Sequence, residues 1–191
     1  FWKSYLRYLV ARTAMKSAVV LGVVGMCLGF QAKAADPAPS FVFDSIDGGS
    51  YDTAAWRGKP VLVVNSASMC GYTPQYADLQ ALSDFYGDKA VVLAVPSNDF
   101  NQELASEAEV KEFCELNYDL TLPMTTIQHV AKGAVHPFYA WVRDSQGFEP
   151  GWNFNKVLIG PDGAFVQAWG SNAKPMGAVK AKMDEIIAAG G

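Results

Sequence analysis

The 191-residue sequence has few histidines and only a short apolar run near its start, and each of these shortages argues against a class of protein. Its two histidines, His129 and His136, stand seven residues apart with no cysteine or carboxylate at metal-ligand spacing, which argues against a metal site. The apolar run from Ala18 to Phe30 has 13 residues, fewer than the roughly 20 that span a bilayer. We therefore expect no metal, no organic cofactor and no stable membrane insertion.

The first 34 residues lack acidic side chains but hold five basic ones. After Met15 come a basic Lys16, the apolar run and then Ala32-Lys33-Ala34, the order of a secretory signal peptide with an A-x-A cleavage site. We expect cleavage near Ala34 and Ala35 rather than a retained anchor, with residues 1–14 as an upstream extension. A Pro-rich linker over 35–40 and one domain over 41–191 would follow, exported to the periplasm or secreted.

Without this leader, ten basic residues face nineteen acidic ones, a net charge of about −9. Such a balance argues against nucleic acid as a partner. Only Cys70 and Cys114 remain of the three cysteines, in a compartment where a disulfide can persist. Any hypothesis must account for the two together.

Strand signals alternate with helix signals along the chain. A β-hairpin is predicted where Phe41–Phe43 and Ser50–Tyr51 flank Asp47-Gly48-Gly49, and a second one where 156–159 and 164–169 flank Gly160 to Gly163. Two continuous apolar runs, 60–65 and 90–95, are typical of strands buried on both faces. Alternating β and α units predict an α/β fold, a central mixed sheet flanked by helices, with an N-terminal β-hairpin.

Helical spacing of apolar residues predicts four helices. The first follows Pro74 and presents Tyr76, Leu79, Leu82 and Phe85 with Tyr86, so Cys70 lies where a buried strand meets a helix. The second is opened by a capping box of Ser106 and Glu109 and carries Cys114 on its apolar face. The remaining two are predicted over 137–143 and around the apolar residues Met176, Val179, Met183 and Ile187.

The position of Cys70 suits a nucleophile, because the N–H groups at a helix N-terminus favour the thiolate form. A buried inert cysteine is the alternative. Thr73 stands where a C-x-x-C motif would have its second cysteine, which argues against a dithiol oxidoreductase of the usual design.

Three stretches, in order, resemble the signatures of the glutathione peroxidase family, and the similarity runs from about Ser40 to the C-terminus. They are NSASMCGYTPQY (65–76), VPSNDF (95–100) followed by Gln102-Glu103, and Trp152-Asn153-Phe154 with Lys156. The resemblance implies a thioredoxin-like fold and a thiol peroxidase of the non-selenium type. Hydrogen peroxide or organic hydroperoxides would be its substrates.

The resemblance also implies a tetrad of Cys70, Gln102, Trp152 and Asn153, whose side-chain N–H donors surround the sulfur. Considered singly, Trp152 is equally typical of a core aromatic and Gln102 of a solvated loop. The sequence departs from the family in two respects. Only Asn101 separates Phe100 from Gln102, where the family usually has two residues. Ser97 and Asp99 replace the usual cysteine and glutamine.

The stretch FCELNY (113–118), followed by Leu122-Pro123, resembles the segment that carries the resolving cysteine in thioredoxin-dependent members. It implies a cycle in which Cys114 condenses with a Cys70 sulfenic acid, and a thioredoxin-like dithiol or glutathione reduces the disulfide. We expect the helix that carries Cys114 to unwind partly in this cycle, and the protein to be a monomer or dimer. The alternatives are a secreted thiol-disulfide oxidoreductase, or a non-enzymatic domain with a structural Cys70–Cys114 disulfide.

Overall fold

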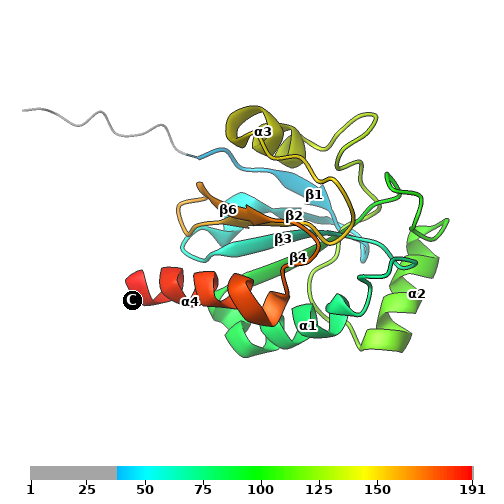
Figure 1. Cartoon of the computed structure of the whole chain (residues 1–191), viewed down its shortest axis with the longest axis horizontal. Helices are drawn as coiled ribbons and strands as arrows, with labels where there is room; N and C mark the ends of the chain where they lie inside the picture. Colours follow the sequence, from blue (N-terminus) through cyan, green and yellow to red (C-terminus); the bar gives the residue numbers. More distant parts are fainter. Residues whose placement is uncertain (1–37, 191) are drawn as a thin grey trace, which may run out of the picture. The chain divides into compact units, whose positions relative to one another are not determined.

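The structure, a computed structural model, describes residues 38–190 (Figure 1). The predicted leader and its cleavage site lie outside the described residues. The described part opens with the predicted hairpin, in which β1 (Val42–Asp44) pairs antiparallel with β2 (Ser50–Asp52). Gly48 and Gly49 in its turn both have positive φ, a conformation that glycine adopts without steric cost.

The central sheet has four strands in the order β4-β3-β5-β6. Its central strand, β3 (Val61–Ser66), is fully buried and pairs parallel with β4 (Val91–Pro96). On its other side β3 pairs antiparallel with β5 (Lys156–Ile159), and β5 pairs antiparallel with β6 (Phe165–Trp169). The sheet is therefore mixed, as predicted.

Helices cover both faces of this sheet (Figure 1). The four α-helices are α1 (Gln75–Tyr86), α2 (Glu107–Tyr118), α3 (Pro137–Gln146) and α4 (Lys180–Ala189). Short helical turns are η1 (Thr53–Trp56), η2 (Gly87–Lys89) and η3 (Pro175–Val179), the last a π-turn that leads into α4. Alternate residues of β3 point to opposite faces, so Leu62 and Val64 pack in one apolar cluster with α1, α2 and α4. Val61 and Val63 pack in the other, with α3.

The helices differ from the sequence prediction in detail. Phe85 and Met176 are exposed rather than buried, because Tyr86 and Val179 occupy the buried positions of their helical turns. Helix α3 continues three residues past the predicted end at Arg143, to a glycine cap in the left-handed conformation at Gly147. Ser106 caps α2 as predicted, with its hydroxyl accepting from the N–H of Glu109.

Candidate active site

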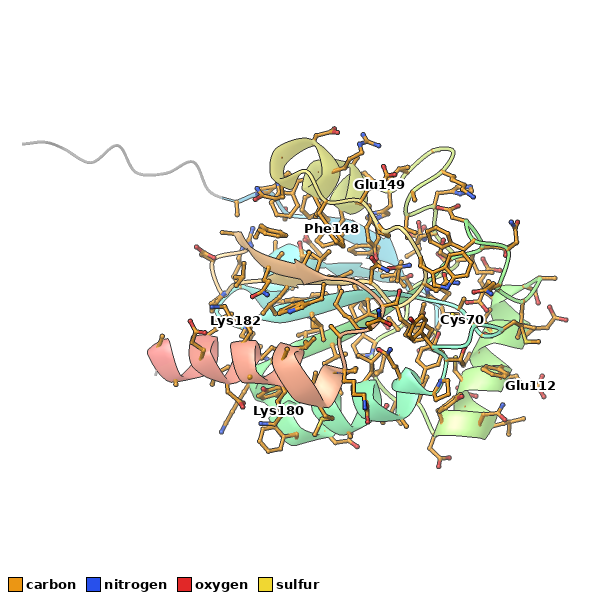
Figure 2. The ribbon with its side chains drawn as sticks, in the orientation of Figure 1. Cys70, Glu112, Phe148, Glu149, Lys180 and Lys182 are labelled. Carbon is orange, nitrogen blue, oxygen red and sulfur yellow. The ribbon has the colours of Figure 1, made fainter. Side chains whose placement is uncertain are left out.

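Cys70 lies at the end of the sheet, in the loop that joins β3 to α1 (Figure 2). The Cys70 N–H donates to the Thr73 hydroxyl at 3.0 Å, and that hydroxyl donates to the Ala67 carbonyl at 2.8 Å. The Tyr72 N–H points at the Cys70 sulfur at 3.4 Å. Thr73 therefore organises the turn in which Cys70 sits, and the turn supplies a backbone donor to the sulfur, an arrangement that stabilises negative charge there.

A second segment, Gln102-Glu103, is hydrogen-bonded to this loop. The Met69 N–H donates to the Gln102 carbonyl and the Ser68 N–H to the Glu103 carboxylate, both at 2.9 Å. The other Glu103 oxygen is buried and has no hydrogen-bond partner among the described residues, and burial raises the pKa of this carboxyl. Asn101, the single residue before Gln102, has φ +57°, a left-handed conformation that asparagine tolerates. The short spacing before Gln102 is thus absorbed by a tight turn.

Gln102 contacts Asn153, although 51 residues separate them. The Asn153 amide nitrogen donates to the Gln102 side-chain oxygen at 3.0 Å, and Asn153 itself is fully buried. The acceptor in this bond is the Gln102 oxygen, so the bond leaves the amide N–H groups of Gln102 available as donors. Gln102 is half-buried and this bond holds it in place, unlike a solvated loop residue.

Trp152 lies at the surface rather than in the core, with 41% of its area exposed. Its ring packs against Phe100 at a centroid distance of 5.5 Å. Its carbonyl accepts from the side-chain amides of Asn65 at 2.9 Å and Asn155 at 2.8 Å. The indole is therefore accessible while its backbone is fixed to the end of β3.

Asn65 joins the end of β3 to the turn that follows Trp152. Besides its bond to Trp152, its side-chain oxygen accepts from the Asn155 N–H at 3.1 Å and its carbonyl accepts from the Phe154 N–H. Phe154 has φ +61°, a strained conformation for an aromatic residue that costs on the order of 1–3 kcal/mol. The bonds from Asn65 and the edge-on packing of Phe154 against Tyr76 hold that conformation.

Cys114 is 1% exposed on the inner face of α2, and both it and Cys70 are free cysteines. Burial, together with the smaller effect of the negative charges of Glu103 and Glu115, raises the pKa of the Cys114 thiol to about 12. The buried Tyr76 hydroxyl acts in the opposite direction on this thiol. Cys114 is thus a protonated, protected thiol in this structure, and no disulfide joins the two cysteines of the described part.

Packing beside Cys114 is incomplete. A cavity of about 200 Å³ lies between α2 and the loops around it. It is lined by apolar residues and by polar and charged ones: Cys114, Ile46, Leu120, Leu122 and Met124 together with Asp47, Lys111, Glu115 and Thr121. Cys114 therefore borders a pocket although its own side chain is buried.

Three polar residues that sequence reasoning did not assign turn out to organise the site. Asp99, which is 7% exposed, accepts from the N–H groups of residues 130–132 at 2.7–3.1 Å and from His129 at 2.7 Å. Burial alone would raise the pKa of Asp99, but these hydrogen bonds lower it below its usual value. Asn65 and the fully buried Lys156 are the others. Asn65 ends the apolar run of β3 and Lys156 begins that of β5, so a polar residue at the end of a buried strand could have indicated these two, whereas Asp99 lies in a polar loop that gives no such signal.

The histidines are structural. His129 bonds to Asp99. His136 caps α3, with its Nδ1 accepting from the Phe138 N–H at 3.2 Å and its Nε2–H donating to the Val42 carbonyl at 2.9 Å, and its ring stacks on Phe43 at a centroid distance of 4.0 Å. Within residues 38–190 no group of three or more potential ligands could hold a metal ion. No helix in that range is long and apolar enough to cross a membrane.

Residues 40–143 match the glutathione peroxidase family. The chain is 38% identical to the glutathione peroxidase-like peroxiredoxin gpx1 of Schizosaccharomyces pombe over 135 residues, which cover 68% of this chain and 85% of the relative. It is 35% identical to the hydroperoxy fatty acid reductase gpx1 of Synechocystis over 159 residues, 75% of this chain and 92% of that one.

A solved structure of the same kind, the apo form of Trgpx, superposes with a TM-score of 0.61 at 32% identity. The match covers 79% of this chain and 97% of that one, and the shared fold is thioredoxin-like. Cysteine stands at position 70, in the first of the three matching signatures. The chain therefore belongs to the glutathione peroxidase family, as a non-selenium member and a thiol peroxidase.

Proposed function

We propose that Cys70 is the peroxidatic residue of this thiol peroxidase. Its thiolate attacks one oxygen of a hydroperoxide, the O–O bond breaks, and the other oxygen leaves as water or an alcohol after taking up a proton. Cys70 is oxidised to a sulfenic acid as the peroxide is reduced. The observation that carries the proposal is the linkage of the Cys70 loop to Gln102 and of Gln102 to Asn153.

Gln102, Trp152 and Asn153 complete the proposed site. The free amide N–H groups of Gln102 and the accessible Trp152 indole supply donors without a competing charge, which suits the developing anion in the transition state. Asn153 accounts for the orientation of Gln102, because its amide occupies the Gln102 oxygen. Removing one such donor is expected to cost on the order of 10²-fold in rate.

Cys114 is the proposed resolving residue. Its thiolate attacks the sulfenic sulfur of Cys70, the S–O bond breaks as the S–S bond forms, and the hydroxide takes up a proton and leaves as water. Because the Cys114 thiol is buried and its pKa is raised, it is a poor nucleophile where it lies, and the proposal includes a local opening of α2 that releases it. The pocket beside Cys114 supports this step, since a side chain that borders a pocket has fewer contacts to break when the helix opens locally.

An external dithiol or two glutathione molecules would then reduce the disulfide. One relative is named a peroxiredoxin and another a hydroperoxy fatty acid reductase, which supports a thiol reductant and organic hydroperoxides among the substrates. We propose that this cycle runs in an exported protein, periplasmic or secreted, as a monomer or dimer, in response to oxidative stress.

A steady-state assay with thioredoxin or glutathione, and with hydrogen peroxide or a fatty acid hydroperoxide, tests the cycle. Cys70→Ser should abolish turnover in every combination. Cys114→Ser should reduce one equivalent of peroxide and then stop with thioredoxin. Unchanged turnover of Cys114→Ser with thioredoxin would exclude the resolving role, and activity in Cys70→Ser would exclude the nucleophile.

A further inference from the structure

Lys156 is a fully buried lysine in the middle layer of the protein, on β5 at the residue that pairs with Val64 of β3. Its ammonium group donates to the Gln75 side-chain oxygen at 2.6 Å and to the Ser171 carbonyl at 3.3 Å. Both partners are neutral, and the six ion pairs of the described residues do not include Lys156. Burying an unpaired charge is costly, so its retention calls for a reason.

The partners of Lys156 belong to the two halves of the site. Gln75 is the first residue of α1, five positions after Cys70, and its N–H donates to the Tyr72 carbonyl in the Cys70 turn at 2.9 Å. The Gln75 amide nitrogen donates to the Ser171 carbonyl at 2.7 Å. Lys156 therefore joins the start of α1 to the Ser171 loop.

The Ser171 loop in turn holds the Trp152 turn. The Ser171 hydroxyl donates to the Asn153 carbonyl at 2.6 Å and accepts from the Asn155 side chain at 3.1 Å. Its neighbour Asn172 hydrogen-bonds the Tyr72 hydroxyl. One continuous set of bonds thus runs from the Cys70 turn through Lys156 and Ser171 to Asn153.

We propose that Lys156 is a positioning residue that sets the Cys70 turn against the Trp152–Asn155 turn by holding Gln75 and Ser171 together. The inference rests on the proposed function of Cys70. A peroxide must meet the sulfur and the surrounding donors at the same time, and misplacement of one relative to the other by about 1 Å is enough to cost on the order of 10²-fold in rate. An alkylating agent needs only the thiolate.

The ratio of two reaction rates of Cys70 therefore reports how well its sulfur is aligned with the surrounding donors. The first is the second-order rate of Cys70 with hydrogen peroxide in a single turnover, and the second is its rate of alkylation by iodoacetamide, both measured from pH 6 to 10. The thiolate fraction affects both rates equally and cancels in the ratio. Lys156→Met should lower the ratio on the order of tenfold at neutral pH, whereas Lys182→Met on α4, distant from Cys70 in Figure 2, should leave it unchanged.

The pH profile provides a signature that a purely structural role would not give. Burial lowers the pKa of Lys156 to about 8, and the groups that contact its ammonium, the Gln75 amide and the Ser171 carbonyl, do not titrate. The ratio in the unsubstituted protein should fall as the pH rises through about 8, because the charge-assisted bonds weaken. The fall should be absent in Lys156→Met.

The Gln75→Glu variant is an independent test, because it leaves the ammonium group of Lys156 in place. A carboxylate beside Lys156 raises the lysine pKa, so the fall in the ratio should move to higher pH. The positioning role is excluded by an unchanged ratio in Lys156→Met, by a fall near pH 8 that persists in it, or, if that variant does not fold, by an unshifted profile in Gln75→Glu. If the unsubstituted protein reacts with peroxide no faster than free cysteine, the proposed function itself fails.

Discussion

At the scale of single residues, Asp99 has a structural role that the sequence of its loop does not predict. Its carboxylate gathers three backbone N–H groups and the His129 ring, and so ties the loop before Gln102 to residues 129–132. Because Gln102 lies three positions further on, the geometry of the site depends on this anchor. Asp99 therefore acts on the position of Gln102 through the backbone between them.

Replacing Asp99 with asparagine should lower the free energy of unfolding by about 2–3 kcal/mol at pH 7, because charge-assisted bonds to buried N–H groups are lost. The folded-state pKa of Asp99 lies below the unfolded value, so its contribution is complete above the unfolded pKa and disappears as the pH falls through the folded one. Urea unfolding at pH 7 and at pH 3 measures this. The exposed Asp88→Asn serves as a control, and an equal loss at both pH values would contradict the assignment.

Cys114 should resist alkylation in the folded protein. With a pKa near 12, its thiolate fraction at pH 8 is on the order of a thousandfold below that of an unperturbed thiol. Mass spectrometry of the Cys114 peptide after iodoacetamide treatment, with and without denaturing urea, compares the two rates directly. Similar rates in the two conditions would show that α2 does not shield the thiol.

At the scale of elements, α2 is the helix whose stability should set the rate of resolution. Ser106→Ala removes its N-cap and should destabilise it by about 1 kcal/mol, raising the open population up to about fivefold. Disulfide formation after one equivalent of peroxide should accelerate by a similar factor.

Ala181→Gly makes a matched control for that experiment. It lies exposed in α4 and should cost about the same in helix stability without touching α2. Quenched samples analysed for disulfide at successive times give both rates. If the two variants accelerate resolution equally, or neither does, opening of α2 does not control the step.

At the scale of the whole molecule, one sheet serves two apolar clusters. Leu93 of β4 belongs to the cluster under α3, and Leu158 of β5 to the cluster under α1 and α4; both are fully buried. A strand cannot separate from one face without exposing the other. The described residues should therefore unfold as one cooperative unit.

Leu93→Ala and Leu158→Ala should each lower the free energy of unfolding by about 2–5 kcal/mol, with the slope against denaturant unchanged. Tryptophan fluorescence and far-ultraviolet circular dichroism should give coincident curves for both variants. Two separate transitions in either variant would show that the faces unfold independently.

The sequence by itself determined the elements, because their signals are local. Apolar runs marked β3 and β4, Asp47-Gly48-Gly49 marked the hairpin, and Ser106 marked the start of α2. Helical spacing could not separate Phe85 from Tyr86, since neighbouring positions both fall near the edge of a helix face and packing decides between them. The position of Cys70 before a helix suggested a nucleophile, and the resemblance to the glutathione peroxidase family added Gln102, Trp152, Asn153 and Cys114.

Only the tertiary structure decided which of these residues meet. The bond from Asn153 to Gln102, the clamp of Gln102 and Glu103 on the Cys70 loop, and the burial of Cys114 all join segments that are distant in sequence. The buried charges of Asp99 and Lys156 belong here too, because an ionisable residue is read as exposed until its partners are known. Patterns of spacing describe one element at a time, whereas hydrogen bonds and desolvation depend on what folding brings beside it.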